Sequence, residues 1–280
     1  MAVLTRRHVG TVGLGRALTV GSPLMARATS EFLRSVSLRA DTPGDGYPYD
    51  LPAVAALHAD PIVFGDVTVL VGQNGSGKST LIEAIAVAAG LNAEGGSSNL
   101  RFTTMATHSD LSQHLAMGWN RRPRWGWFLR AETFYGMATH IARDSDVDER
   151  GKPLGVAGMF PDLHARSHGE SFLRLIESRF GDTGFYVMDE PESALSFQGQ
   201  LGLLRFMHDA VAAGSQFVIA THSPVLMRMP GAIIYDLDAG ITACDYDDLT
   251  VVELWRRFMN APERILDRLL ADDPADVPDT

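Results

Sequence analysis

The sequence predicts an α/β fold in which a central, mainly parallel β-sheet is flanked by helices. Short apolar runs of strand length alternate with segments of helical periodicity in the second half of the chain. A glycine-rich stretch, GQNGSGKST, lies between an apolar run and a helical segment, and an acidic pair ends another apolar run. Helices that alternate with apolar strands form βαβ units, and such units build a parallel sheet.

Composition is typical of a globular protein and argues against several classes of function. Of its 280 residues, 45% are hydrophobic and 21% charged, which is typical of a chain with a sizeable core. The formal net charge of −10 argues against coating nucleic acid by bulk electrostatics. One cysteine, Cys244, excludes an intramolecular disulfide and a cysteine-based zinc cluster, and it favours a reducing compartment. No run of 18 apolar residues predicts a membrane span, so we expect a cytoplasmic protein.

The N-terminal half begins with an expected extension at residues 1–30. Its TRRHVG sequence and the later ARA resemble a twin-arginine export signal, but Arg16 interrupts the apolar stretch and disfavours export. Alternation predicts a strand at 35–40, and turn-forming residues predict a loop at 41–52. The elements expected next are short strands at 61–65 and 67–72, a helix at 79–90 ended by Gly90, a strand at 125–131, a helix at 132–143 and an exposed loop at 144–155.

The second half has the clearer pattern. We expect helices at 171–180, 197–213 and 250–270 and strands at 184–190, 216–221 and 232–238. In the last helix, apolar residues recur at helical spacing, and an acidic tail follows at 271–280. The predicted organisation is one domain over residues 31–270, with a helical insertion at about 100–180.

The glycine-rich stretch fits the pattern G-x-x-x-x-G-K-[ST] between a strand and a helix. Its glycines let backbone N–H groups surround a phosphate chain, and the helix N-terminus adds partial positive charge. Lys78 would reach the β- and γ-phosphates of ATP, and the Ser79 hydroxyl would bind Mg²⁺. The residues predicted to bind the nucleotide here are Gly72, Asn74, Gly75, Ser76, Gly77, Lys78, Ser79 and Thr80.

The ends of two further predicted strands carry residues suited to binding Mg²⁺ and to hydrolysing ATP. Asp189 ends the apolar run FYVMD, where a carboxylate can hold Mg²⁺, and Glu190 suits the base that orients an attacking water. His222 follows the next strand, in ATHSP, at the same expected sheet edge. We therefore predict that His222 contacts the γ-phosphate, and we class Glu190, His222 and Lys78 as catalytic candidates. Ser79 and Asp189 are the metal candidates.

The order P-loop, SHGES, VMDEPESALS, ATHSP resembles the ABC-type ATPases, and more closely a group of small bacterial AAA-family ATPases. The resemblance covers about residues 31–270. It implies an ABC-like P-loop NTPase with a small helical subdomain, ATP and Mg²⁺ as ligands, and an ATP-dependent homodimer. It also implies that residues 193–196 form a D-loop at the dimer interface. Ser167 and Gly169 would act as the signature loop toward ATP bound by the partner protomer.

The chain departs from the ABC pattern at several positions. Arg166, His168 and Glu170 replace the first Leu, first Gly and Gln of the usual L-S-G-G-Q signature. No obvious Q-loop glutamine is present, and Glu132 holds the corresponding place, with Gln113 a weaker candidate. An aromatic residue that stacks on adenine could be Tyr47 or Tyr49.

Two other patterns suggest different functions. His164 and His168 have the i,i+4 spacing of a metal pair, and Ser167 beside His168 could be a nucleophile and its base. Both interpretations are disfavoured, because no third ligand is evident and Glu190 with water already accounts for hydrolysis. The stretch WNRRPRWGWFLR at 119–130 has the composition of a nucleic-acid contact, although arginine stems packed on apolar surface explain it better.

The sequence therefore predicts a Mg²⁺-dependent ATPase that acts as an ATP-sandwich dimer with an unidentified effector protein. Three different roles stay open: an ATPase of DNA maintenance related to SMC or RecF heads, the ATPase subunit of a transporter, and an ATP-dependent regulator with little turnover.

Overall fold

The computed structural model describes residues 31–92, 109–130, 183–238 and 240–270 of the chain. Its main sheet has six strands in the order β5-β6-β7-β3-β8-β9. Five of them run parallel, and β9 pairs antiparallel with β8 at one edge. The expected central, mainly parallel sheet is thus confirmed. The strands are β3 (Val67–Val71), β5 (Gly126–Arg130), β6 (Phe185–Asp189), β7 (Gln216–Ala220), β8 (Ile233–Asp236) and β9 (Thr242–Cys244).

The register of the central strands aligns their carboxyl ends. Ala220 of β7 lies opposite Leu70 of β3 on one side and opposite Asp189 of β6 on the other. Every residue of β3, β6 and β7 is buried, which explains why they are apolar except for Thr68, Asp189 and Gln216. Segments that follow these three strands consequently leave the sheet at one edge, where α/β proteins bind ligands.

A second, three-stranded antiparallel sheet has the order β2-β1-β4. Its strands are β1 (Leu33–Leu38), β2 (Ile62–Val63) and β4 (Leu115–Trp119). The buried Gln216 side chain fastens this sheet to the main one: its Oε1 accepts from the Leu33 N–H at 2.7 Å. Its Nε2 donates to the carbonyls of Leu33 and Gly65 at 2.8 and 2.9 Å. A buried amide that is fully hydrogen-bonded in this way costs little to desolvate.

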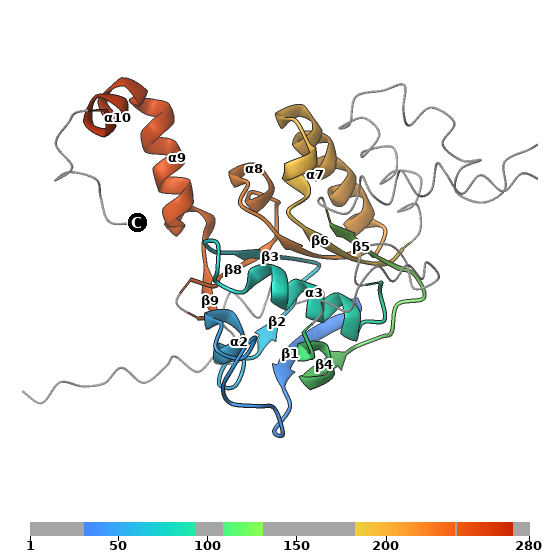
Figure 1. Cartoon of the computed structure of the whole chain (residues 1–280). Helices are drawn as coiled ribbons and strands as arrows, with labels where there is room; N and C mark the ends of the chain where they lie inside the picture. Colours follow the sequence, from blue (N-terminus) through green and yellow to red (C-terminus); the bar gives the residue numbers. More distant parts are fainter. Residues whose placement is uncertain (1–30, 93–108, 131–182, 239, 271–280) are drawn as a thin grey trace, which may run out of the picture.

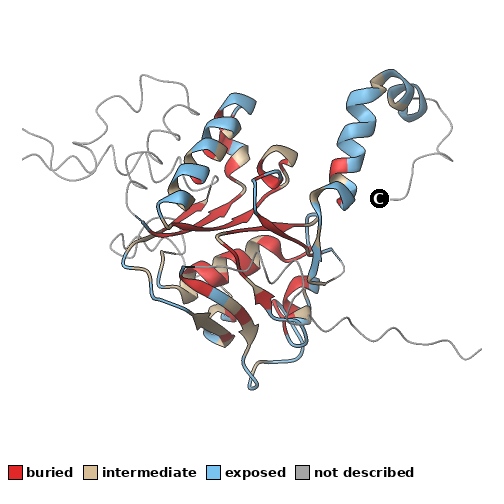
Figure 2. Cartoon of the chain, turned by 180° about the vertical axis from the view of Figure 1, so that it is seen from behind, coloured by how far each residue is buried: buried red, intermediate tan, exposed pale blue. Residues whose placement is uncertain are grey.

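Helices cover both faces of the main sheet (Figure 1). On one face lie α3 (Lys78–Ala88), the short helices α2 (Pro52–Ala56) and α4 (Leu111–His114), and the small sheet. On the other face lie α7 (Phe197–Ala212) and α8 (Pro224–Met227). Buried residues accordingly form two apolar clusters. Figure 2 shows that the main sheet is buried and that the helices of both layers are buried in part.

The C-terminal segment differs from the single helix expected at 250–270. The structure has two helices, α9 (Thr250–Asn260) and α10 (Pro262–Leu269), which stand away from the sheet (Figure 1). Pro262 at the start of α10 has no N–H to continue α9, which explains the break. Within the described residues, Val252 is the one buried residue of these two helices.

Several expectations concern residues outside the described ranges, namely the extension 1–30, the tail 271–280 and the helices at 132–143 and 171–180. The described part of the expected insertion at about 100–180 contains α4 and the strands β4 and β5 of the two sheets. Among the described residues, no helix is long and apolar enough to cross a membrane.

Candidate functional site

The P-loop connects β3 to α3 at the aligned edge of the main sheet. Gly77 has φ of +94° directly before α3, and a Cβ there would lie 3.0 Å from Leu51 Cβ, so the turn favours glycine. Lys78 begins the helix with its side chain only 4% exposed. The N-terminus of α3 has no side-chain cap, so its N–H groups are available to an anion.

The other P-loop residues differ in how far they are exposed to solvent. Asn74 and Gly75 are exposed at its tip, whereas Ser76 is buried. Gly72 lies close to the Asp238 carboxylate, and a Cβ at Gly72 would be 2.8 Å from Ser76 Oγ. The same carboxylate, which follows β8, accepts from the Gln73 N–H at 2.5 Å and so holds the start of the loop.

Ser79 and Asp189 meet at this edge from α3 and β6. Ser79 Oγ donates to Asp189 Oδ1 at 3.2 Å. Hydroxyl and carboxylate oxygens are the ligands Mg²⁺ prefers, and it usually completes its shell with phosphate oxygens and water. Among the described residues, no group of three or more His, Cys, Asp or Glu side chains could hold a metal on its own. The pair therefore fits a Mg²⁺ ion that arrives with a nucleotide better than a free-standing metal site.

Asp189 is buried, and burial raises its pKa to about 6. The nearby charge of Glu190 raises this pKa too, while Arg130, Ser79 and Lys78 oppose the rise. Arg130, at the end of β5, lies with Nε 3.5 Å from Asp189 Oδ2, and its Nη1 donates to Glu83 Oε2 of α3 at 2.7 Å. This arginine therefore links β5, β6 and α3 behind the candidate metal position.

Glu190 is the point on which two other side chains converge. Its Oε1 lies 3.9 Å from Lys78 Nζ and 3.5 Å from His222 Nε2. Glu190 has φ of +48°, a left-handed conformation that a residue other than glycine adopts at a cost of roughly 1 kcal/mol or more. Such strain is common where an active site fixes a side-chain direction. The start of α3 and the segments that follow β6 and β7 thus meet around the Glu190 carboxylate.

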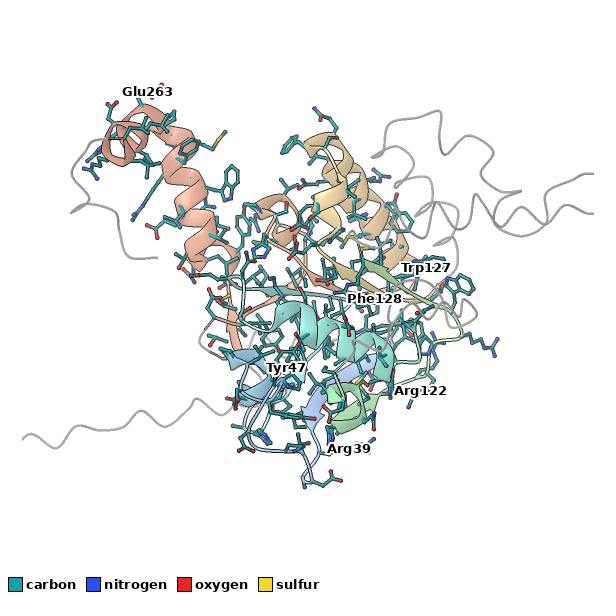
Figure 3. All side chains as sticks on the ribbon, viewed as in Figure 1. Arg39, Tyr47, Arg122, Trp127, Phe128 and Glu263 are labelled. Atoms are coloured by element: carbon teal, nitrogen blue, oxygen red, sulfur yellow. The ribbon has the colours of Figure 1, made fainter. Side chains whose placement is uncertain are left out.

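Tyr47 and Tyr49 occupy different environments. Tyr49 is buried, donates to Asp110 Oδ1 at 2.7 Å and packs edge-on against His114, so its ring faces are not free to stack on a base. Tyr47, which Figure 3 labels, is 73% exposed. Its hydroxyl lies 3.5 Å from Thr80 Oγ1 at the end of the P-loop. Of the two candidates, only Tyr47 is placed to stack on a nucleotide base.

Part of the predicted site lies outside the described residues. This applies to Ser167, Gly169, Arg166, His168, Glu170, His164 and Glu132. Gln113 is exposed on α4, which packs against α3 in the layer of the small sheet. The expected D-loop is described: residues 191–194 form a 3-10 helix, and Ser193 and Ser196 are exposed.

The arginine- and tryptophan-rich stretch at 119–130 makes contacts within the chain. Arg121 pairs with Glu31 at 3.2 Å and lies over the Phe32 ring, and Arg122 lies over the Trp119 ring. Trp127 is fully buried on β5. These contacts support the packing interpretation over a nucleic-acid surface.

Four polar residues near the site were not predicted from the sequence. They are Arg130, Glu83, Asp238 and Glu192. Glu192 accepts from the His222 N–H at 2.6 Å. Its place two residues after Glu190 could have signalled it, because an acid there follows the same strand end.

Parts of the chain are similar to known proteins. A family model described as "AAA domain, putative AbiEii toxin, Type IV TA system" matches residues 67–123. The Cytochrome c biogenesis ATP-binding export protein CcmA of Rhodopseudomonas palustris (strain HaA2) is 27% identical over 169 residues, which is 58% of this chain and 80% of the relative. The SMC head domain from Thermotoga maritima aligns with 18% identity and a TM-score of 0.41, covering 76% of this chain and 99% of that domain.

Proposed function

Given the fold and motif order of an ABC-like P-loop ATPase, we propose that this chain binds Mg·ATP at the carboxyl edge of its main sheet and hydrolyses it. The observation that carries the proposal is the convergence of Lys78 and His222 on Glu190 Oε1, beside the Ser79–Asp189 pair. These groups come from the start of α3, from the end of β6 with the residue after it, and from the loop after β7.

The P-loop would hold the triphosphate. Backbone N–H groups of the loop and of the first turn of α3 face the phosphates, and the buried Lys78 ammonium balances their charge in a site of low solvent access. Tyr47 would stack on the adenine, since its exposed ring lies next to Thr80. Ser79 and Asp189 would hold Mg²⁺, which supplies positive charge to the phosphate oxygens when bound.

Hydrolysis would proceed by in-line attack of water on the γ-phosphorus. The water oxygen bonds to phosphorus as the bond to the β,γ-bridging oxygen breaks, giving ADP and phosphate. Glu190 orients the water and takes its proton, and His222, 3.5 Å from the Glu190 carboxylate, would contact the γ-phosphate. Lys78 stabilises the negative charge that moves toward the leaving oxygen.

The test is phosphate release by the purified protein and its Glu190→Gln variant. We expect the variant to bind ATP but to turn over at least roughly 100-fold more slowly, because the amide cannot accept the proton. Glu253→Gln on α9, an exposed carboxylate remote from the sheet edge, is the matched control and should keep the wild-type rate. Unchanged turnover in Glu190→Gln would remove Glu190 from the role of base. No turnover in the wild type, with and without added nucleic acid, would refute the ATPase activity.

We also propose that two copies form an ATP-sandwich dimer, in which SHGES of one copy contacts ATP bound by the other. This rests on the family resemblance and is supported by the exposed Ser193 and Ser196 of the expected D-loop. Glu190→Gln with ATP should then accumulate dimer in sedimentation experiments. A Ser167→Arg variant that still dimerises and hydrolyses ATP normally would rule out the role of Ser167.

One relative supports a more specific candidate. The similarity to an ATP-binding export protein favours a role as the ATPase subunit of an export system over a role in DNA maintenance or in regulation. Such a subunit should co-purify with a membrane protein from detergent extracts of its native cells. A protein found only in the soluble fraction, with full ATPase activity and no membrane partner, would speak against this role.

A further inference from the structure

The loop that carries His222 is held by side chains from another segment. The loop follows β7, and Thr221 at its start is fully buried, with its N–H donating to the Leu70 carbonyl at 3.2 Å. Thr221 Oγ1 accepts from the Ser223 N–H at 3.0 Å, which closes a tight local turn. These bonds fix where the loop starts, but none of them involves His222 itself.

Glu192 makes the hydrogen bond to His222. It stands in the 3-10 helix after β6, and the Glu190 N–H, two residues earlier, donates to Ala220 of β7 at 2.9 Å. From there Glu192 Oε1 reaches across the sheet edge and accepts from the His222 N–H at 2.6 Å. Its Oε2 is buried and has no hydrogen-bond partner among the described residues. The bond to His222 is therefore the evident reason for a carboxylate at this partly buried position.

Gln200 makes a second connection from the same segment. On the first turns of α7, its Oε1 accepts from Ser223 Oγ at 2.5 Å. The Ser223 oxygen in turn accepts from the N–H groups of Val225 and Leu226 at 3.1 and 3.3 Å and caps α8. Two neighbouring residues of the loop are thus hydrogen-bonded to residues 190–200. His222 is bound through its backbone N–H and Ser223 through its side chain.

We infer that Glu192 is a positioning residue for His222, with Gln200 as its support. Glu192 and Glu190 belong to one short turn, so the bond from Glu192 sets the distance between the Glu190 carboxylate and the His222 ring, now 3.5 Å. Residues 190–200 include the expected D-loop, so a shift of that turn would move His222 with it. The loop and the turn therefore move together. The distance between Glu190 and His222 matters because a displacement of about 1 Å can cost around 100-fold in rate.

The inference rests on the proposed ATP hydrolysis and is tested with matched variants. Glu192→Ala removes the acceptor, whereas Glu192→Gln keeps an oxygen that can accept from the His222 N–H. Gln200→Ala removes the second connection, and Gln198→Ala, at an exposed position of the same helix, is the control. Three quantities are measured for each: kcat for ATP hydrolysis, the Kd for ATP with EDTA present, and hydrogen exchange of the His222 amide.

Glu192→Ala should lower kcat about tenfold or more, leave the Kd within about twofold, and speed exchange of the His222 amide by about tenfold. Glu192→Gln should restore kcat and amide protection to within about threefold of wild type, and Gln200→Ala should have a smaller effect of the same kind. Gln198→Ala should match wild type.

Each contrary result has a distinct meaning. If Glu192→Ala exposes the amide but keeps wild-type kcat, the positioning role is overturned while the ATPase proposal stands. Unchanged amide exchange would show that the bond does not hold the loop, which also overturns the inference. Failure of Glu192→Gln to restore kcat would overturn the role as a hydrogen-bond acceptor. Absence of turnover in wild type would refute the proposed function, and the positioning role in hydrolysis with it.

Discussion

Arg130 and Asp189 face each other at the ends of neighbouring parallel strands, with Arg130 Nε 3.5 Å from Asp189 Oδ2. Burial dominates the environment of Asp189 and raises its pKa to about 6, so the arginine offsets only part of the desolvation. Keeping the buried Asp189 carboxylate charged costs free energy as long as no further cation is bound beside it. The Mg²⁺ ion proposed above would offset this cost, whereas without a cation the charged carboxylate lowers stability.

The first prediction concerns Asp189→Asn in the absence of metal and nucleotide. The pKa of Asp189 is higher in the folded protein than its ordinary value of 3.8, so the folded state binds the proton more tightly than the unfolded state. The contribution of Asp189 to stability is therefore greatest below pH 4 and is lost as the pH rises from about 4 through about 6. Above pH 7, the loss is on the order of 2–3 kcal/mol.

An asparagine does not titrate and escapes this loss. The free energy of unfolding of Asp189→Asn minus that of wild type should therefore rise between pH 4 and 6.5 and stay constant above pH 7. Urea unfolding in EDTA at four pH values measures this difference, and subtraction removes the effect of carboxylates that do not interact with Asp189. A difference that falls with rising pH would contradict the environment described for Asp189.

The second prediction separates the two tyrosines upstream of the P-loop. Tyr47→Ala should weaken ATP binding about 5- to 100-fold, since stacking of an aromatic ring on a base is worth roughly 1–3 kcal/mol. Tyr47→Trp should retain binding, and Tyr49→Phe should leave the affinity unchanged because Tyr49 is buried against Asp110. Calorimetric titration with ATP and with inorganic triphosphate measures the effect. An equal loss of affinity for triphosphate in Tyr47→Ala would rule out contact with the base.

The central elements of the fold were predictable because each is encoded locally. The runs that became β3, β6 and β7 are buried along their whole length, and a strand buried on both faces is mostly apolar rather than alternating. The P-loop and the acidic pair lie directly at the ends of such runs. Finding the strands therefore also placed Lys78, Asp189, Glu190 and His222 at one edge.

Features that depend on pairing across the chain were not predictable in this way. β4 is only partly buried and pairs with β1 across more than 70 residues of sequence, so no alternation marked it. Tyr49 and Tyr47 differ because Asp110 lies beside one of them, 61 residues away in sequence. The bond from Glu192 to His222 likewise exists only because β6 and β7 are neighbours in the sheet.

The third prediction concerns the single cysteine. Burial, followed by the charge of Asp236, raises the pKa of the Cys244 thiol to about 11. Because the thiolate is the reactive form, about one thiol in a thousand or fewer is reactive at pH 7.5. Alkylation of the native protein with iodoacetamide should thus be slow at pH 7.5 and reach the rate of a free thiol only in denaturant. Rapid labelling of the folded protein would contradict the raised pKa of the half-buried Cys244 on β9.

The last prediction tests whether the apolar side of α9 is uncovered in solution. Val252 is 1% exposed and packs on the apolar cluster of the main sheet, whereas Trp255, one turn later, is 51% exposed. Val252→Ala should lower the free energy of unfolding by about 1–3 kcal/mol, since it leaves a cavity. Trp255→Gln should lower it less than Val252→Ala does, because about half of Trp255 is already exposed and its loss leaves no enclosed cavity. Urea unfolding at two protein concentrations tenfold apart measures both variants. If Trp255→Gln costs as much as Val252→Ala and the cost grows with concentration, the exposed side of α9 is covered by a second copy, and the isolated position in Figure 1 describes only the monomer.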